Sequence, residues 1–333
     1  MKKIALIFTL ALLLILPAFS GGTNEATDDG TLKIGVSKFL AHPALDAVEQ
    51  GMQDYLATTN LKVSYDFQNA NGDVSTSASI AQKFKSEGDD IVVGIATPTA
   101  QALANVFTDI PVLFAAVTDP IEAGLVTSYE GSPDSNVTGV SDMNPVDSQI
   151  KLLIDVTGAK AIGNIYASGE QNGVILMEQA KAACEKYGVE FVPVSIANSS
   201  EVKQAAQSII DRVDAIYIAT DNAVISALAA VDDVCNANGK VLFSSDPSGV
   251  DGLECMISWG FNYHSLGVAT GKLIEEIANG ASAGSLPTVF LTDPKEFELW
   301  FNLDTAKKLG YTIPEEYLAN ASVIIENGVK TTK

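Results

Sequence analysis

The stretch Ile91–Leu103, "IVVGIATPTAQAL", decides the fold. It starts as a short apolar run, which is typical of a strand that is buried on both faces. It then continues as a helix, and Pro98 suits the first turn because its missing N–H group would be unpaired there anyway. A buried strand that leads directly into a helix indicates βαβ units, so we predict an α/β fold with a mainly parallel sheet.

The second half of the chain echoes the first in the same order. The stretch "KIGVSKF" (33–39) resembles "AIGNIYAS" (161–168), and "GIATPTAQALANV" (94–106) resembles "YIATDNAVISALAAV" (217–231). In the same way "VLFAAVTDP" (112–120) resembles "VLFSSDP" (241–247). Such internal repetition predicts two Rossmann-like lobes with parallel sheets, joined by a multi-strand hinge with a cleft between them.

The N-terminus has the pattern of a secretory signal peptide. Lys2 and Lys3 precede a mostly apolar run at 4–16, and "PAFSGG" follows with small residues at the cleavage positions. A cysteine after this run would indicate a lipid anchor, but Ser20 and Gly21 stand there. We therefore expect an exported, extracytoplasmic protein at the cell surface or in the periplasm, and the sequence as given does not support a lipid anchor.

These patterns give predicted boundaries for the parts of the chain. We expect a signal peptide at 1–20, a flexible leader at 21–31, an N-terminal lobe at 32–142 plus 259–286, and a C-terminal lobe at 143–258 plus 287–333. Within the first lobe, we expect His42 and Asn71 to cap the helices that follow them, and Thr97 is a further candidate for a helix cap.

Composition argues against several classes of function. The formal net charge is −21, or −23 without Lys2 and Lys3, and so acidic a surface repels nucleic acid and anionic membranes. The chain has two histidines and none of the GxSxG, HExxH or GxGxxG motifs, so we expect no enzyme, no metal site and no cofactor. Its three cysteines lack a CxxC pair, so neither a zinc site nor a disulfide scaffold is indicated. We expect buried free thiols, with one disulfide as the alternative in an oxidising compartment.

In parallel sheets ligands bind beyond the carboxyl ends of the strands, and the residues there are mostly hydroxyls, amides and carboxylates. The predicted ligand-binding residues are Ser37, Phe39, Thr97, Thr99, Gln101, Thr118, Asp119, Ser168, Glu170, Asn172, Asp221, Asn222, Asp246 and Trp259.

The charges among these residues favour a zwitterionic ligand. Free N–H groups near Thr99, with Thr97 and Ser168, suit a carboxylate, because the single arginine, Arg212, falls at the opposite ends of the strands. Asp246 or Asp221 would pair with an ammonium group, since a buried carboxylate needs a partner. Phe39 and Trp259 would form the walls around the ligand side chain. Each aspartate could instead be only a helix cap or turn residue.

The sequence resembles a known family at "IGVSKFLAHPALDAVEQGM", "GIATPTAQALA", "AVTDP", "TDN" and "ISWGFNYHSLGVATGKL". It is similar over residues 32–330 to ABC-transporter substrate-binding proteins of the tryptophan/tyrosine-uptake type. The resemblance implies a periplasmic binding protein fold of type I, an amino-acid ligand, and delivery to membrane permease and ATPase subunits. A nucleoside or sugar ligand, or a sensor role at a membrane receptor, remains an alternative.

Overall fold

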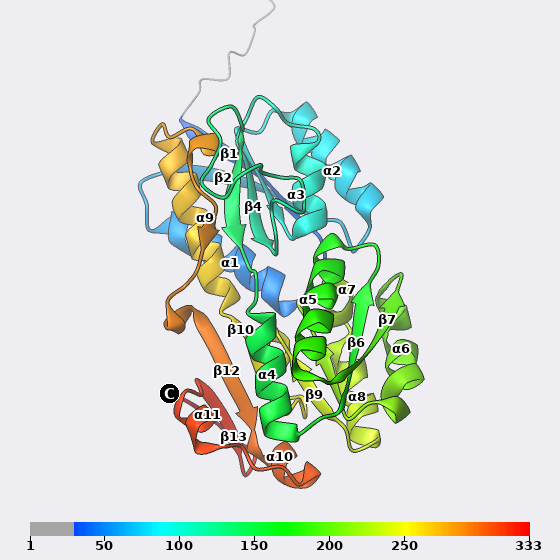
Figure 1. Cartoon of the computed structure of the whole chain (residues 1–333). Coiled ribbons are helices and arrows are strands. Elements are labelled where there is room, and N and C mark those ends of the chain that lie inside the picture. The colour runs from blue at the N-terminus through cyan, green and yellow to red at the C-terminus, as the bar shows by residue number, and fades with distance from the viewer. Residues whose placement is uncertain (1–29) are drawn as a thin grey trace, which may run out of the picture. The chain divides into compact units, whose positions relative to one another are not determined.

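The computed structural model describes residues 30–333 (Figure 1). The predicted signal peptide at 1–20 and residues 21–29 of the predicted leader lie outside these residues, whereas Thr31 already belongs to the first strand. Within the described part of the chain, no helix combines the length and the apolar character needed to cross a bilayer.

The first lobe is built on a six-stranded sheet in which every neighbouring pair of strands is parallel. Across the sheet its strands are β11 (Val289–Phe290), β5 (Val137–Ser141), β4 (Val112–Val117), β3 (Ile91–Ile95), β1 (Thr31–Lys38) and β2 (Lys62–Asn69). Its helices are α1 (Pro43–Ala57), α2 (Val74–Glu87), α3 (Thr97–Ala104) and α9 (Tyr263–Ala278). The short helix η4 (Ala283–Ser285) precedes β11.

The second lobe is built on an eight-stranded sheet. Across the sheet its strands are β14 (Val329–Thr332), β13 (Val323–Glu326), β12 (Phe297–Asn302), β10 (Ile257–Phe261), β9 (Val241–Ser244), β8 (Ala215–Ile218), β6 (Ala161–Ala167) and β7 (Glu190–Ile196). Its α-helices are α4 (Val146–Thr157), α5 (Gln171–Tyr187), α6 (Val202–Ile209), α7 (Asn222–Ile225), α8 (Leu228–Ala237), α10 (Leu303–Leu309) and α11 (Glu315–Ala319). Its short helices are η1 (Ser199–Glu201), η2 (Ile210–Arg212), η3 (Pro247–Gly249) and η5 (Pro294–Glu296).

The two sheets share one parallel arrangement, which confirms the predicted pair of Rossmann-like lobes. The order β5-β4-β3-β1-β2 in the first lobe corresponds to β10-β9-β8-β6-β7 in the second. The chain passes between the lobes after β5, after β10 and after β11, so three segments form the predicted multi-strand hinge. β10 belongs to the larger sheet and β11 to the smaller; the residue-by-residue lobe boundaries stay predictions.

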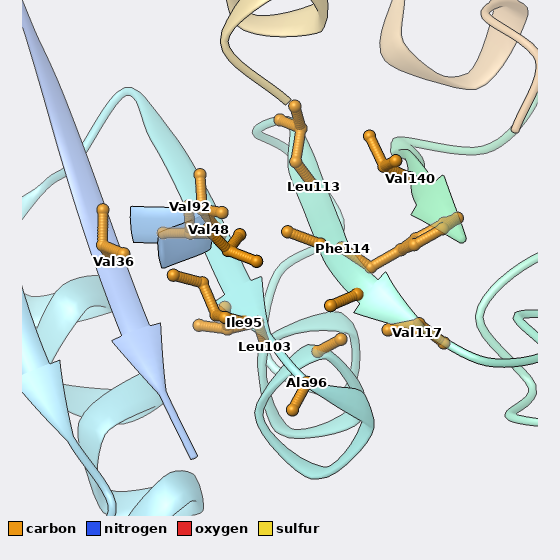
Figure 2. Close-up of a cluster of buried hydrophobic side chains, with 14 of the residues drawn as sticks. Val36, Val48, Val92, Ile95, Ala96, Leu103, Leu113, Phe114, Val117 and Val140 are labelled. Atoms are coloured by element: carbon orange, nitrogen blue, oxygen red, sulfur yellow. The ribbon is translucent and has the colours of Figure 1, made fainter. Parts of the chain in front are cut away.

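Apolar side chains fill both faces of the smaller sheet. Figure 2 shows Val92 and Ile95 of β3 clustered with Phe114 of β4 and Val48 of α1, all of which belong to one buried core. Helices α1 and α9 lie on one face and α2 and α3 on the other (Figure 1), which explains why β3 is apolar throughout. Gly94 allows α3 to approach this strand, because a Cβ atom there would lie 2.5 Å from the Ala100 backbone.

The larger sheet separates two further cores. One contains apolar residues of α4, α5 and α10, and the other contains those of α6, α7 and α8. Cys184, Cys235 and Cys255 lie buried in these cores with free thiols.

The helix starts differ in part from expectation. His42 is the residue before α1, as predicted, although its side chain makes no capping hydrogen bond. The prediction for Asn71 is wrong: Asp73 caps α2 by accepting a hydrogen bond from the Thr76 N–H, while Asn71 adopts a left-handed turn with φ 52°. Thr97 is likewise the first residue of α3 and not its cap, because the cap position falls on Ala96.

Candidate functional site

A small cavity lies between the lobes, where the carboxyl ends of the two sets of strands meet. The first lobe contributes His42, Leu45, Ala116, Thr118, Asp142 and Tyr263, and the second contributes Asn172, Thr220, Asp221, Asn222, Ile225 and Asp246. The cavity volume is about 10 Å³, close to the space that one water molecule needs. A larger ligand therefore enters only when the lobes or the lining side chains move apart.

The backbone of the first lobe is strained beside this cavity. Ala96, at the end of β3, has φ 79° and ψ 159°, a conformation that is essentially restricted to glycine. Ala116 near the end of β4 also has a positive φ, of 54°. The two positions are neighbours, because the Ala96 N–H donates to the Ala115 carbonyl at 2.9 Å. Strain of this kind is concentrated at ligand sites.

The strained corner leads directly into α3, whose first residue is Thr97. The N–H groups of Thr97 and Thr99 have no acceptor within residues 30–333. The Thr99 hydroxyl lies 2.8 Å from the Ile95 carbonyl and 2.9 Å from that of Ala96, so this side chain stabilises the corner. Unpaired N–H groups at the positive end of a helix are suited to an anionic ligand group.

Four buried carboxyl groups lie at the cavity or next to it: those of Asp142, Asp221 and Asp246 line it, and that of Glu170 is hydrogen-bonded to Asn222 of its wall. Removal from water raises the pKa of all four, that of Asp142 to about 6. No lysine or arginine of residues 30–333 is among the buried residues. The site is therefore rich in acidic groups and lacks a fixed cation to pair with them.

Two of these carboxylates are held by the protein itself. Asp221 accepts hydrogen bonds from the N–H groups of Ala167 at 2.6 Å and Val224 at 3.1 Å, which uses both of its oxygens. Glu170 accepts from the Ala223 N–H at 3.0 Å and from the Asn222 side-chain amide at 2.5 Å. Through these hydrogen bonds the two carboxylates fix the start of α7 against β6 and against the start of α5.

The other two carboxylates, those of Asp142 and Asp246, accept fewer hydrogen bonds from backbone N–H groups. Asp142 accepts hydrogen bonds from two hydroxyl groups, those of Thr118 at 3.3 Å and Tyr263 at 3.1 Å. Asp246 accepts from the Ser248 N–H at 2.8 Å through one oxygen. Asp246 is thus the carboxylate best placed to pair with a cationic ligand group.

Three buried polar atoms of the cavity wall have no partner among the described residues. They are Nδ1 of His42, Oδ1 of Asn172 and Oγ1 of Thr220. Buried polar groups are almost always hydrogen-bonded in folded proteins, so their convergence on one cavity indicates a binding site.

The lobes also contact each other directly around this site. His42 Nε2 lies 3.2 Å from the Asn222 side-chain oxygen, across the cleft. Nearer the surface the Gln101 amide donates to Gln171 at 2.9 Å, and Gln171 donates in turn to the Glu122 carbonyl. These contacts hold the two lobes together over the cavity.

The structure brings together only part of the predicted binding set. Five of the predicted residues line the cavity: Thr118, Asn172, Asp221, Asn222 and Asp246. Phe39 and Glu170 line a second cavity between the lobes. Ser37, Thr97 and Thr99 are buried at strand ends without lining either one.

The remaining predicted residues make other contacts. Gln101 bridges the lobes, and Asp119 accepts hydrogen bonds from the Ile121 N–H and the Tyr129 hydroxyl within its own loop. Ser168 is exposed. Trp259 packs against the core of the second lobe, away from the cavity.

The predicted set omits four polar residues of the cavity wall: His42, Asp142, Thr220 and Tyr263. Asp142 directly follows the strand "VTGVS", but the next helix begins only at Val146, so the strand-to-helix pattern that marked Asp246 is missing there. Tyr263 is the first residue of α9 and approaches the site only because the chain crosses between the lobes there.

The fold and the cavity define a two-lobed binding protein of the periplasmic type I class. The sequence matches the family "ABC transporter substrate binding protein" over residues 33–325, and the chain belongs to this family. A tyrosine-binding protein of Clostridioides difficile (strain R20291) is 38% identical over 296 residues, which cover 86% of this chain and 83% of the relative.

Two solved structures extend the comparison. An ABC domain from Streptococcus pneumonia in complex with L-Trp is 36% identical, with a TM-score of 0.83 over 89% of this chain and 100% of that one. The ligand-free, open structure of a substrate-binding protein with adhesive properties from Clostridium difficile is 34% identical, with a TM-score of 0.66 over 89% and 99%. The present structure is thus more similar to the tryptophan complex.

Proposed function

We propose that this protein is the extracytoplasmic solute-binding component of an ABC importer and that it captures a zwitterionic aromatic amino acid. The observation that carries this proposal is the charge arrangement of the cavity. Asp142, Asp221 and Asp246 line the cavity, and no lysine or arginine among the described residues is buried. The unpaired N–H groups of α3 follow Ala96, whose own N–H bonds to the Ala115 carbonyl, next to Ala116 of the cavity wall. A ligand with both an ammonium and a carboxylate group complements the two sides.

Each charged group of the ligand then has a partner. The ammonium lies against Asp246, with Asp142 nearby. The carboxylate lies at the N–H groups of Thr97 and Thr99. We also predict that Ser168 helps to bind the ligand carboxylate. Phe39 and Trp259 are predicted to form the walls around the ligand side chain.

The relatives support the aromatic part of the proposal. One is a tyrosine-binding protein, and a solved structure of another holds L-Trp. With roughly a third of its residues identical to theirs over most of its length, this chain fits a ligand of the same kind.

Binding is coupled to closure of the lobes. Because residues of both lobes line the cavity, a ligand there adds contacts that exist only when the lobes are closed, and it shifts the balance toward that form. The closed form presents a surface that spans both lobes to the membrane permease, which works together with the ATPase subunits.

The test is calorimetric titration with L-tyrosine and two analogues, tyramine, which lacks the carboxylate, and 3-(4-hydroxyphenyl)propionate, which lacks the ammonium. L-Tyrosine should bind most tightly. The analogue without the ammonium should bind least, because it leaves the buried carboxyl groups without a partner. Equal affinity for all three compounds would show that the site does not recognise a zwitterion.

A further inference from the structure

Two side-chain hydrogen bonds join the three segments of the hinge. Asp142 begins the first crossing, directly after β5, and its carboxylate accepts from the Tyr263 hydroxyl at 3.1 Å. Asn262 lies in the second crossing, between β10 and α9, and its side-chain amide donates to the Glu298 carboxylate at 2.8 Å. Glu298 belongs to β12, the strand that follows the third crossing. Because Asn262 and Tyr263 are consecutive, these two bonds connect all three crossings.

Glu298 is held in place from the second lobe. Its oxygen Oε2 accepts a hydrogen bond from the Trp300 indole N–H at 2.8 Å, while Oε1 accepts the bond from Asn262. Trp300 is buried in the core that contains residues of α6, α7 and α8. In addition, β12 pairs antiparallel with β10 as far as the hinge, where Phe261 lies opposite Phe297. The carboxylate therefore has a fixed position on the second-lobe sheet.

Asn262 is attached to the first lobe through α9. Its side-chain oxygen accepts a hydrogen bond from the Ser265 N–H at 3.2 Å and so caps this helix. Helix α9 packs closely along α1 (Figure 1), since a Cβ atom at Gly267 would lie 2.1 Å from the Val48 carbonyl oxygen. Close-packed helices move together as one body. A rotation of the first lobe against the second therefore changes the distance between Asn262 and Glu298.

This hinge pair, Asn262 and Glu298, lies outside the binding site. Neither residue lines either of the two cavities between the lobes, whereas Tyr263, which directly follows Asn262, lines the first. The hydrogen bond of the hinge pair is present in a form whose lobes are in contact, with His42 Nε2 3.2 Å from the Asn222 side-chain oxygen across the cleft. The bond and the closed cavity thus belong to the same arrangement of the lobes.

We propose that Glu298, acting through Asn262, positions the lobes at the angle that completes the cavity, and so determines ligand affinity without contacting the ligand. This inference rests on the proposed function. A hydrogen bond to a carboxylate is stronger than one between neutral groups, so its loss at the hinge favours the open form. A ligand that binds only the closed form then binds more weakly, because a smaller fraction of the protein is competent to receive it.

Asn262→Asp separates this role from helix capping. Aspartate caps a helix as well as asparagine does, but it places a second carboxylate beside Glu298 in place of the amide donor. The backbone bond from the Asn262 N–H to the Glu296 carbonyl, at 2.8 Å, is unaffected. Asn302→Asp is a matched control, because Asn302 ends β12 and caps α10 by accepting from the Thr305 N–H at 3.0 Å, within the second lobe.

The reciprocal change completes a double-mutant cycle. Glu298→Gln alone supplies one oxygen where the carboxylate supplied two, so either Trp300 or Asn262 loses its acceptor. In the double variant Asn262→Asp/Glu298→Gln, the glutamine amide donates to the introduced carboxylate and its oxygen accepts from the Trp300 indole. The hydrogen bond is restored with donor and acceptor exchanged, so the affinity should recover.

The measurements are the dissociation constant of L-tyrosine by calorimetry and the radius of gyration of the ligand-free protein by small-angle X-ray scattering. Asn262→Asp should weaken binding about tenfold, the change in equilibrium that corresponds to loss of a hydrogen bond to a charged group, and should enlarge the radius of gyration. Glu298→Gln should weaken binding several-fold. The double variant and Asn302→Asp should match the unmodified protein in both measurements.

The outcomes separate this inference from the proposed function. If the unmodified protein does not bind L-tyrosine or L-tryptophan, the proposed function is wrong, and an equal radius of gyration for Asn262→Asp overturns the hinge role as well. If the unmodified protein binds and Asn262→Asp binds as tightly as Asn302→Asp, the proposed function stands and the hinge pair does not determine affinity. Weakened binding that the double variant fails to restore also overturns the inference. If Asn262→Asp does not fold, unchanged affinity of Glu298→Gln overturns it.

Discussion

Asp142→Asn tests the electrostatic character of the cleft in the ligand-free protein. Burial raises the Asp142 pKa from 3.8 to about 6, so between these pH values the folded protein holds a proton that the unfolded chain has released. Stability therefore falls as the pH rises from 4 to 6 and stays lower above pH 6. At 1.36 kcal/mol per pKa unit, the destabilisation at neutral pH is about 3 kcal/mol.

Asparagine keeps the shape of the side chain and cannot ionise. The free energy of unfolding of Asp142→Asn, relative to the unmodified protein, should therefore increase by about 3 kcal/mol between pH 4 and pH 7.5. Urea denaturation at a series of pH values measures this difference, and other titrating groups cancel because both proteins share them. Asp73→Asn is a control of opposite sign, because hydrogen bonds from Ser75 and Thr76 lower the pKa of that exposed carboxyl group. Parallel stability curves for Asp142→Asn and the unmodified protein would refute the reasoning.

Two further substitutions test the ammonium partner in the second lobe and the strained corner in the first lobe. Asp246→Ala should weaken the binding of an aromatic amino acid by about 2–5 kcal/mol, measured by calorimetry, because a buried ammonium group would lose its partner; unchanged affinity would transfer this role to another carboxylate. Ala96→Gly should stabilise the protein by about 1 kcal/mol in urea denaturation, because relief of about 1–3 kcal/mol of backbone strain exceeds the added chain entropy of glycine. A loss of stability would show that Ala96 is not strained.

Much of the fold could be predicted because local patterns determine it. Buried parallel strands such as β3 read as apolar runs, and Pro98 marks the first turn of α3. The repeated order of strands and helices was sufficient to predict two similar lobes. The start of α2 was misplaced because Asn71 and Asp73 are equally good capping residues, and only the turn geometry decides between them.

The cavity could be predicted only in part, because it depends on how the chain crosses between the lobes. Thr118 and Asp246 follow strands in a repeated unit, and the strand-end rule located them. Asp142 begins a hinge crossing and has no helix directly after it, so it lacked the usual strand-to-helix signal. Trp259 lies on β10, which pairs antiparallel with β12, and that distant pairing directs its side chain into the second-lobe core.

The measurement that most directly tests the central claim is a thermal-shift screen of residues 21–333 against amino acids, nucleosides and simple sugars. A ligand at about 100 times its dissociation constant adds about 2.7 kcal/mol of stability, which corresponds to a shift of several degrees. We expect tyrosine, tryptophan or phenylalanine to produce this shift. A shift with a nucleoside or a sugar alone would contradict the recognition of a zwitterionic aromatic amino acid.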